Sequence, residues 1–111
     1  MMGLLASAIL IWITGLEEQP DYCYEGKVTG YIRTDFSGRT YDGTNIRTGE
    51  AIAAAGWNIP IDSYVWVQGV GVFRVADRGR LGPGHIDIAV WTRAEAYALT
   101  GVYPICVWLP D

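Results

Sequence analysis

The sequence is poor in the residues that build metal sites, redox centres and nucleic-acid surfaces. It has one histidine, two cysteines, and eight Lys and Arg against twelve Asp and Glu, which gives a net charge of -4. The single histidine excludes a histidine-rich metal site, the cysteines form no CxxC motif, and no cofactor is expected. Nucleic-acid binding is not expected either, because neutralising phosphates requires clustered basic side chains.

Charged side chains are also missing from the first sixteen residues. The apolar core of this segment, residues 4–13, matches the length of a signal-peptide core better than a membrane span of about 20 residues. No Lys or Arg precedes it, so a retained membrane anchor and a core segment of a larger assembly stay open beside an export signal. We therefore predict an export signal or anchor at 1–16, a polar linker at 17–26 and one domain at 27–111.

The two cysteines, Cys23 and Cys106, are far apart in the sequence. In an exported protein they could form a disulfide that ties the N-terminal segment to the last strand. Two buried free thiols are the alternative, and the spacing does not decide between them.

Glycine is abundant, with fourteen residues, and half of the chain is hydrophobic. This composition is typical of short strands joined by turns. We expect strands at 28–34, 50–55, 64–67, 70–76, 86–90 and 105–109, with a hairpin turn at Gln68-Gly69. Thr92 and Glu95 form a capping box that predicts one helix, which ends near Gly101. Six strands and one helix in so short a domain favour a closed β-barrel, because closure removes exposed strand edges.

Two aspartates frame a glycine-rich loop. Asp77 follows a predicted strand, and Asp87 lies within the next one, between Ile86 and Ile88. If Asp87 points inward, desolvation raises its pKa, as a general acid requires; if it points outward, it is a solvated strand residue. Asp77 is either a turn former or the partner of Asp87, since acid–base chemistry on sugars commonly uses two carboxyls.

Several short motifs occur in an order that resembles a known family. They are Thr29-Gly30-Tyr31, Thr40-Tyr41-Asp42-Gly43, Ile59-Pro60-Ile61-Asp62-Ser63, Val75-Ala76-Asp77-Arg78-Gly79 and His85-Ile86-Asp87. With the closing segment 92–107, they are similar to the "3D" domain of lytic transglycosylases, named for its three aspartates. This resemblance implies a six-stranded double-psi β-barrel, a fold shared in outline with expansins.

The resemblance also implies peptidoglycan as the substrate. Asp87 would be the acid/base that protonates the oxygen between N-acetylmuramic acid and N-acetylglucosamine and then helps to close a 1,6-anhydro ring. Asp77 would hold Asp87 or contact the sugar. The predicted substrate contacts are Thr29, Tyr31, Thr40, Gly79, His85 and Trp57; for His85 a surface position at a strand end is the alternative, and for the aromatic residues core or turn packing.

The chain departs from this family at one position. The family's first aspartate falls at about residues 53–55, which are all alanine here. Three hypotheses therefore stay open. The first is a muralytic enzyme at the cell wall, of bacterial or phage origin. The second is a non-catalytic wall-binding or wall-loosening module, and the third is a structural component of a phage particle or envelope assembly.

Overall fold

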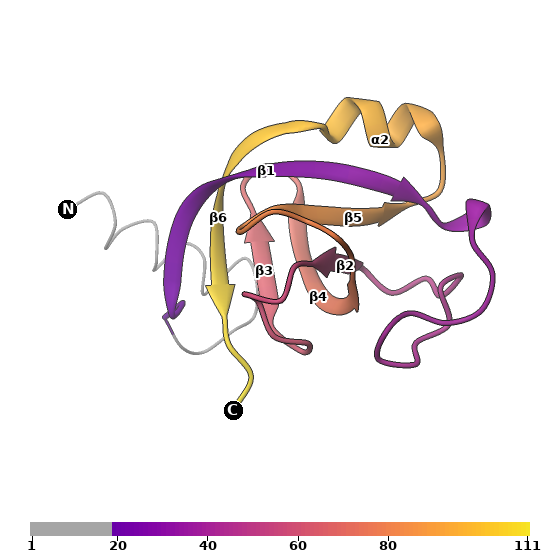
Figure 1. Cartoon of the computed structure of the whole chain (residues 1–111). Coiled ribbons are helices and arrows are strands. Elements are labelled where there is room, and N and C mark those ends of the chain that lie inside the picture. The colour runs from indigo at the N-terminus through magenta and orange to yellow at the C-terminus, as the bar shows by residue number, and fades with distance from the viewer. Residues whose placement is uncertain (1–18) are drawn as a thin grey trace.

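The computed structural model describes residues 19–111, which form a closed β-barrel with one α-helix (Figure 1). In chain order the elements are β1 (Tyr22–Ile32), the 3₁₀ turn η1 (Arg33–Asp35), β2 (Ile52–Ala55), β3 (Tyr64–Val67), β4 (Gly71–Arg78), β5 (Ile86–Val90), α2 (Arg93–Leu99) and β6 (Gly101–Trp108). The predicted signal or anchor at 1–16 lies outside the described residues. None of the helices at 19–111 is long and apolar enough to cross a membrane.

The six strands close in the order β1-β5-β2-β4-β3-β6. The pairs β1/β5 and β2/β4 are parallel, and the remaining pairs are antiparallel. This mixed topology is consistent with a double-psi barrel and confirms the predicted fold class. Every strand has two neighbours, so the barrel has no free edge that could pair with another chain.

The barrel interior is filled by small and β-branched side chains that alternate along the strands. Among those with no exposed surface are Val28, Val65, Val75, Ile86 and Ile105. Side chains between them point to the outside of the barrel, since successive residues of a strand face opposite ways. Polar residues placed between buried ones, such as Asp87, are therefore on the outer face.

The domain begins earlier than predicted. β1 starts at Tyr22, inside the segment interpreted as a linker, and residues 22–28 pair with residues 101–107 of β6. Glu25, inside the predicted linker, and Lys27, which follows it, occupy the solvent face of this strand. The same pairing lengthens β6. This strand begins at Gly101 rather than at the predicted residue 105.

The disulfide proposed for Cys23 and Cys106 is present, with an S–S distance of 2.06 Å. The two residues are register partners in the antiparallel pair β1/β6. The bond therefore links the first and last strands of the barrel, and the free-thiol alternative is wrong.

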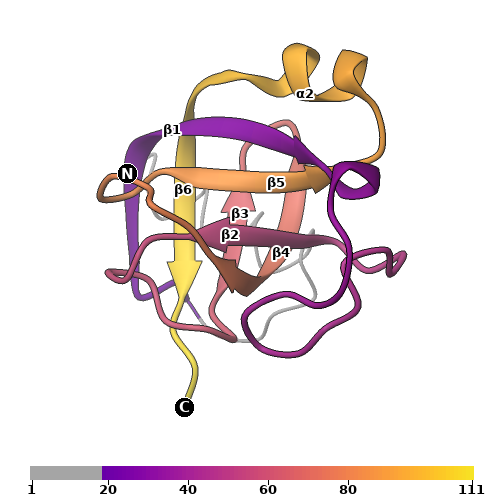
Figure 2. The same cartoon turned by 45° about the vertical axis from the view of Figure 1, so that its right-hand side comes forward.

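Two local predictions are confirmed. β3 and β4 form the expected hairpin, whose turn contains Gly69 at a φ of 78°. The Thr92 hydroxyl accepts a hydrogen bond from the Glu95 backbone N–H, and the Glu95 carboxylate accepts one from that of Thr92, which completes the capping box. In both views α2 lies over β1, on the outside of the barrel, and the long β1–β2 connection loops out at the same end (Figures 1 and 2).

Candidate functional site

A row of outward-facing side chains crosses four adjacent strands. Thr29 on β1 is the register partner of Asp87 on β5, and Asp87 is the partner of Ala54 on β2. Ala54 is in turn the partner of Asp77 on β4. Register partners on neighbouring strands share a face of the sheet. The two aspartates therefore lie on one face, separated by the width of β2.

A β-bulge turns Asp77 to this face. Ala53 pairs with Val75, but Ala54 pairs with Asp77, so Ala76 is an extra residue on β4. In a regular strand Asp77 would point the same way as Val75, into the barrel, because side chains two positions apart share a face. The extra residue shifts the alternation by one and directs Asp77 outward, the kind of re-aiming that bulges produce.

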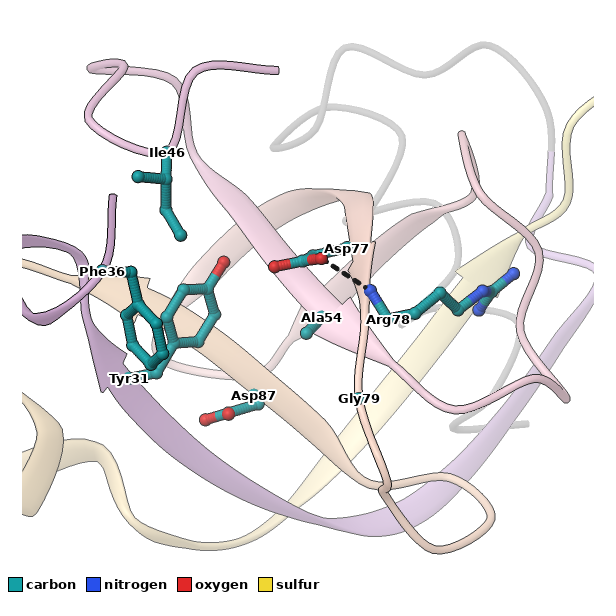
Figure 3. Close-up of a pocket in the computed structure, with 8 residues that line it drawn as sticks. All are labelled: Tyr31, Phe36, Ile46, Ala54, Asp77, Arg78, Gly79 and Asp87. Atoms are coloured by element: carbon teal, nitrogen blue, oxygen red, sulfur yellow. Dashed lines mark hydrogen bonds between the residues drawn. The ribbon is translucent and has the colours of Figure 1, made fainter. Parts of the chain in front are cut away.

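Around the two carboxyls lies a pocket of about 210 Å³ (Figure 3). Ala54 forms part of its floor, Arg78 and Gly79 lie at the end of β4, and Tyr31 comes from β1. The lining is completed by Phe36 and Ile46, which come from the connection between η1 and β2. The rings of Tyr31 and Phe36 contact each other edge to face, with centroids 5.8 Å apart.

The connection is held against the barrel by a buried cation. Arg33 donates to the backbone carbonyls of Thr48, Glu50 and Ala89, the last two at 2.7 and 3.2 Å. Its guanidinium also lies 5.0 Å from the centre of the Trp91 ring. Buried charges are stable only when they are hydrogen-bonded in this way. Arg33 thus fixes both ends of the segment that forms the outer wall of the pocket.

Asp77 is held by the backbone. Its Oδ1 atom accepts hydrogen bonds from the backbone N–H of Tyr41 at 3.0 Å and of Arg78 at 2.9 Å. These bonds fix the orientation of the carboxylate, and no backbone N–H of residues 19–111 donates to its Oδ2 atom. Figure 3 shows the Tyr31 hydroxyl pointing in the direction of Asp77. That hydroxyl is buried and has no hydrogen-bond partner among residues 19–111, and burial, then the nearby Asp77 and Asp87, raise the Tyr31 pKa.

Asp87 has a different environment. Burial raises its pKa above the ordinary value, and the charge of Asp77 adds to this effect, whereas a hydrogen bond from Thr29 and the proximity of His85 oppose it. The Thr29 hydroxyl donates to Asp87 Oδ1 at 2.9 Å, and the Nε2 atom of His85 is 2.7 Å from the same hydroxyl oxygen. Burial lowers the pKa of His85.

The three groups form a chain along which a proton can be exchanged. A hydroxyl carries one proton, so when Thr29 donates to an ionised Asp87, His85 must donate to Thr29. When Asp87 is protonated, both bonds can reverse, and a neutral His85 accepts. Asp87 thus points to the outside of the barrel, and yet its carboxyl is desolvated. The reason is that loops cover this face of the barrel.

The predicted site residues do not all gather here. Asp77, Asp87, Tyr31 and Gly79 line the pocket. Thr29 adjoins it through its hydrogen bond to Asp87, and His85 adjoins it through its hydrogen bond to Thr29.

Two other predicted contacts lie elsewhere. Trp57 is outside the pocket but touches its wall, with the Arg78 guanidinium 5.0 Å from its ring centre. Thr40 is buried and donates to Asp42 at 2.7 Å, so its observed role is to shape the loop rather than to line the pocket.

Sequence reasoning missed Phe36, Ile46 and Arg78 as lining residues. The first two lie in a turn-rich segment without periodicity, where no sequence signal indicates which side chains turn back to the barrel. Among the described residues, no group of three or more His, Cys, Asp or Glu side chains is arranged to hold a metal ion.

The comparisons with known proteins identify the fold. No protein-family model matches the sequence, and no curated protein matches it significantly. A crystal structure of an apo expansin from Clavibacter michiganensis is similar, with a TM-score of 0.54 and 17% sequence identity. The similarity covers 81% of this chain and 51% of the expansin, so the chain spans about half of that protein's length. At this identity the likeness establishes that the two proteins share a barrel fold over this region.

Proposed function

We propose that this domain binds cell-wall polysaccharide and acts as a wall-loosening module. The observation that carries the proposal is a pocket on an expansin-like barrel that holds an oriented carboxylate, Asp77, and a half-buried carboxyl, Asp87. Sugar hydroxyls both donate and accept hydrogen bonds, so they suit a site with groups of each kind. The exposed aromatic residues nearby supply apolar surfaces for the faces of sugar rings.

Catalysis is the second candidate, and the environment of Asp87 favours it. Its raised pKa increases the fraction that carries a proton, which is what a general acid must donate to a glycosidic oxygen. A lytic transglycosylase then uses the same group as a base, and the substrate's own C6 hydroxyl closes the 1,6-anhydro ring. Asp87 would supply both steps, with Asp77 contacting the sugar. This hypothesis requires peptidoglycan as the substrate and accords with the resemblance to the three-aspartate family.

The disulfide supports a location outside the cytoplasm. Disulfides persist mainly in oxidising compartments, such as the periplasm and the extracellular space, where wall polymers are found. We propose that the protein is exported. Attachment to a membrane through residues 1–16, or incorporation in a phage particle, would place the same domain at the wall.

The test is a sedimentation and release assay on the whole chain. The protein is incubated with peptidoglycan sacculi or with microcrystalline cellulose, and the pellet and soluble products are analysed by gel and mass spectrometry. Asp87→Asn and Asp77→Asn are compared with Glu25→Gln, a control at an exposed carboxylate of β1 outside the pocket.

Three outcomes separate the hypotheses. Sedimentation without release, weakened by the pocket variants and not by the control, supports the binding module. Anhydro-muropeptides that disappear in Asp87→Asn support the enzyme. Neither sedimentation nor release would contradict both and would favour the structural role.

A further inference from the structure

A second pocket, of about 280 Å³, adjoins the first. Tyr31 and Phe36 line both, so the two pockets meet at this ring pair. The second pocket lies over β1 and α2, and β1 is the strand next to β5. The two pockets therefore follow one another in a line that crosses β4, β2, β5 and β1.

The position of α2 explains the second pocket. Gly30 on β1 lets the helix approach closely, because a Cβ atom at this position would lie 3.0 Å from Ala96 Cα. The approach brings Arg93 and Tyr97 to the rim of the pocket. These residues are four positions apart and so share a face of the helix.

The rim is polar and carries no net charge. Arg93 and Asp35 bring one charge of each sign, and no hydrogen bond or ion pair joins either side chain to another residue of the described part, 19–111. Their donors and acceptors are available to hydroxyl groups. Tyr97 is 71% exposed. A neutral ligand with many hydroxyls and an apolar ring face matches this chemistry better than an ion does.

The other end of the line has a second exposed aromatic residue. The Trp57 side chain is 73% exposed, yet it is held in place by Arg78 on its ring and by Tyr41, whose ring lies edge to face at 5.5 Å. Tyr41 is anchored to the pocket through its backbone bond to Asp77. An aromatic ring fixed before binding loses little entropy when a ligand stacks on it.

We propose that both pockets form one groove that binds a single β-1,4-linked polysaccharide chain across the strands. One unit stacks on Trp57, the chain passes Asp77 and Asp87, and further units lie between Arg93 and Tyr97. Three inter-strand spacings from β4 to β1 amount to roughly 14 Å. The aromatic residues at the two ends, Trp57 and Tyr97, lengthen the groove further. The inference rests on the proposed binding of polysaccharide and adds that several consecutive units are bound.

Calorimetric titration with oligosaccharides of increasing length tests the groove. Disaccharide, tetrasaccharide and hexasaccharide are titrated in two series, one of β-1,4-linked glucose and one of β-1,4-linked N-acetylglucosamine. The two series distinguish a glucose-based wall polymer from an N-acetylglucosamine-based one. The affinity is expected to rise with length in one series. Tyr97→Ala and Trp57→Ala should each lower the ratio of hexasaccharide to disaccharide affinity about 3- to 10-fold, the usual effect of one aromatic contact.

The control is Tyr64→Ala, which removes a partly exposed tyrosine on β3 that lines neither pocket. It should leave the ratio unchanged, and thermal unfolding verifies that each variant folds. If the hexasaccharide binds no better than the disaccharide, or if the ratio survives both variants, the continuous groove is wrong while polysaccharide binding stands. If no oligosaccharide binds and no wall polymer sediments the protein, the proposed function itself fails.

Discussion

Removing the disulfide between Cys23 and Cys106 tests how much this bond contributes to the stability of the barrel. The perturbation is the double variant Cys23→Ala, Cys106→Ala, which removes the bond and leaves no reactive thiol. The bond joins register partners on β1 and β6 and closes a loop with a sequence separation of 83 residues. Nearly the whole described chain lies within that loop, so its removal frees the unfolded chain more than the folded one.

The magnitude follows from the loop length. The chain-entropy relation gives about 4.5 kcal/mol at 25 °C for a loop of this size. The native state loses a further contribution, because Cys106 packs in a small cluster with Trp66 and Trp108. Domains of this size have total stabilities of about 5–15 kcal/mol, so the loss is a large fraction of the total. We expect the melting temperature to fall by about 15 °C or more.

Urea denaturation measures the effect. The double variant is compared with the oxidised protein and with the wild type in reductant, and the midpoint and the slope are both recorded. The slope should rise without the disulfide, because a less constrained unfolded chain exposes more surface. A loss of stability below about 1 kcal/mol with an unchanged slope would refute the reasoning, since the unfolded chain would then not be restrained by the bond.

Three further predictions concern the site. Thr29→Val removes a hydroxyl that stabilises the ionised form of Asp87, whereas Thr29→Ser keeps one. NMR titration should therefore find a higher Asp87 pKa in Thr29→Val than in Thr29→Ser. An equal or lower pKa would contradict the hydrogen bond between Thr29 and Asp87. The folded pKa of Asp87 is raised, so ionisation destabilises the fold as pH rises from the unfolded towards the folded pKa. Asp87→Asn should therefore gain stability relative to wild type as pH rises through and above the unfolded aspartate pKa of about 4 in urea denaturation; a gain that is constant or falls with pH would oppose this. Gly30→Ala places a methyl group against Ala96 and should cost about 1–3 kcal/mol by thermal unfolding, whereas a neutral effect would mean that α2 moves easily.

The sequence predicted much of the fold because its signals are local. The capping box at Thr92, the hairpin turn at Gly69 and the run of short apolar segments each specify structure within a few residues. The strand from Tyr22 was missed because its polar residues occupy the solvent face of a pair whose partner, β6, lies at the other end of the chain. Long-range pairing of this kind leaves no local signal.

The site was predicted in part for the same reason. Asp77 and Asp87 were identified as a pair because they frame one loop, but two features place them on one face of the barrel. The bulge at Ala76 reverses the direction of Asp77, and the pairing of both aspartates with Ala54 sets their separation. Phe36 reaches the pocket only through the anchoring of its loop by the buried Arg33, which sequence patterns do not reveal.

Two identical side chains are thus given different properties by their surroundings. Asp77 is oriented by two backbone N–H groups, whereas Asp87 is desolvated and bridged by Thr29 to His85. Between them stands Ala54, whose methyl group leaves the space open where a larger side chain would fill it. Under the proposed function, this space would admit a sugar to both carboxyls. Under the proposed function, the protonatable carboxyl of Asp87 beside this pocket would contact a bound glycan, and cleavage would require a route in which the same carboxyl acts first as acid and then as base.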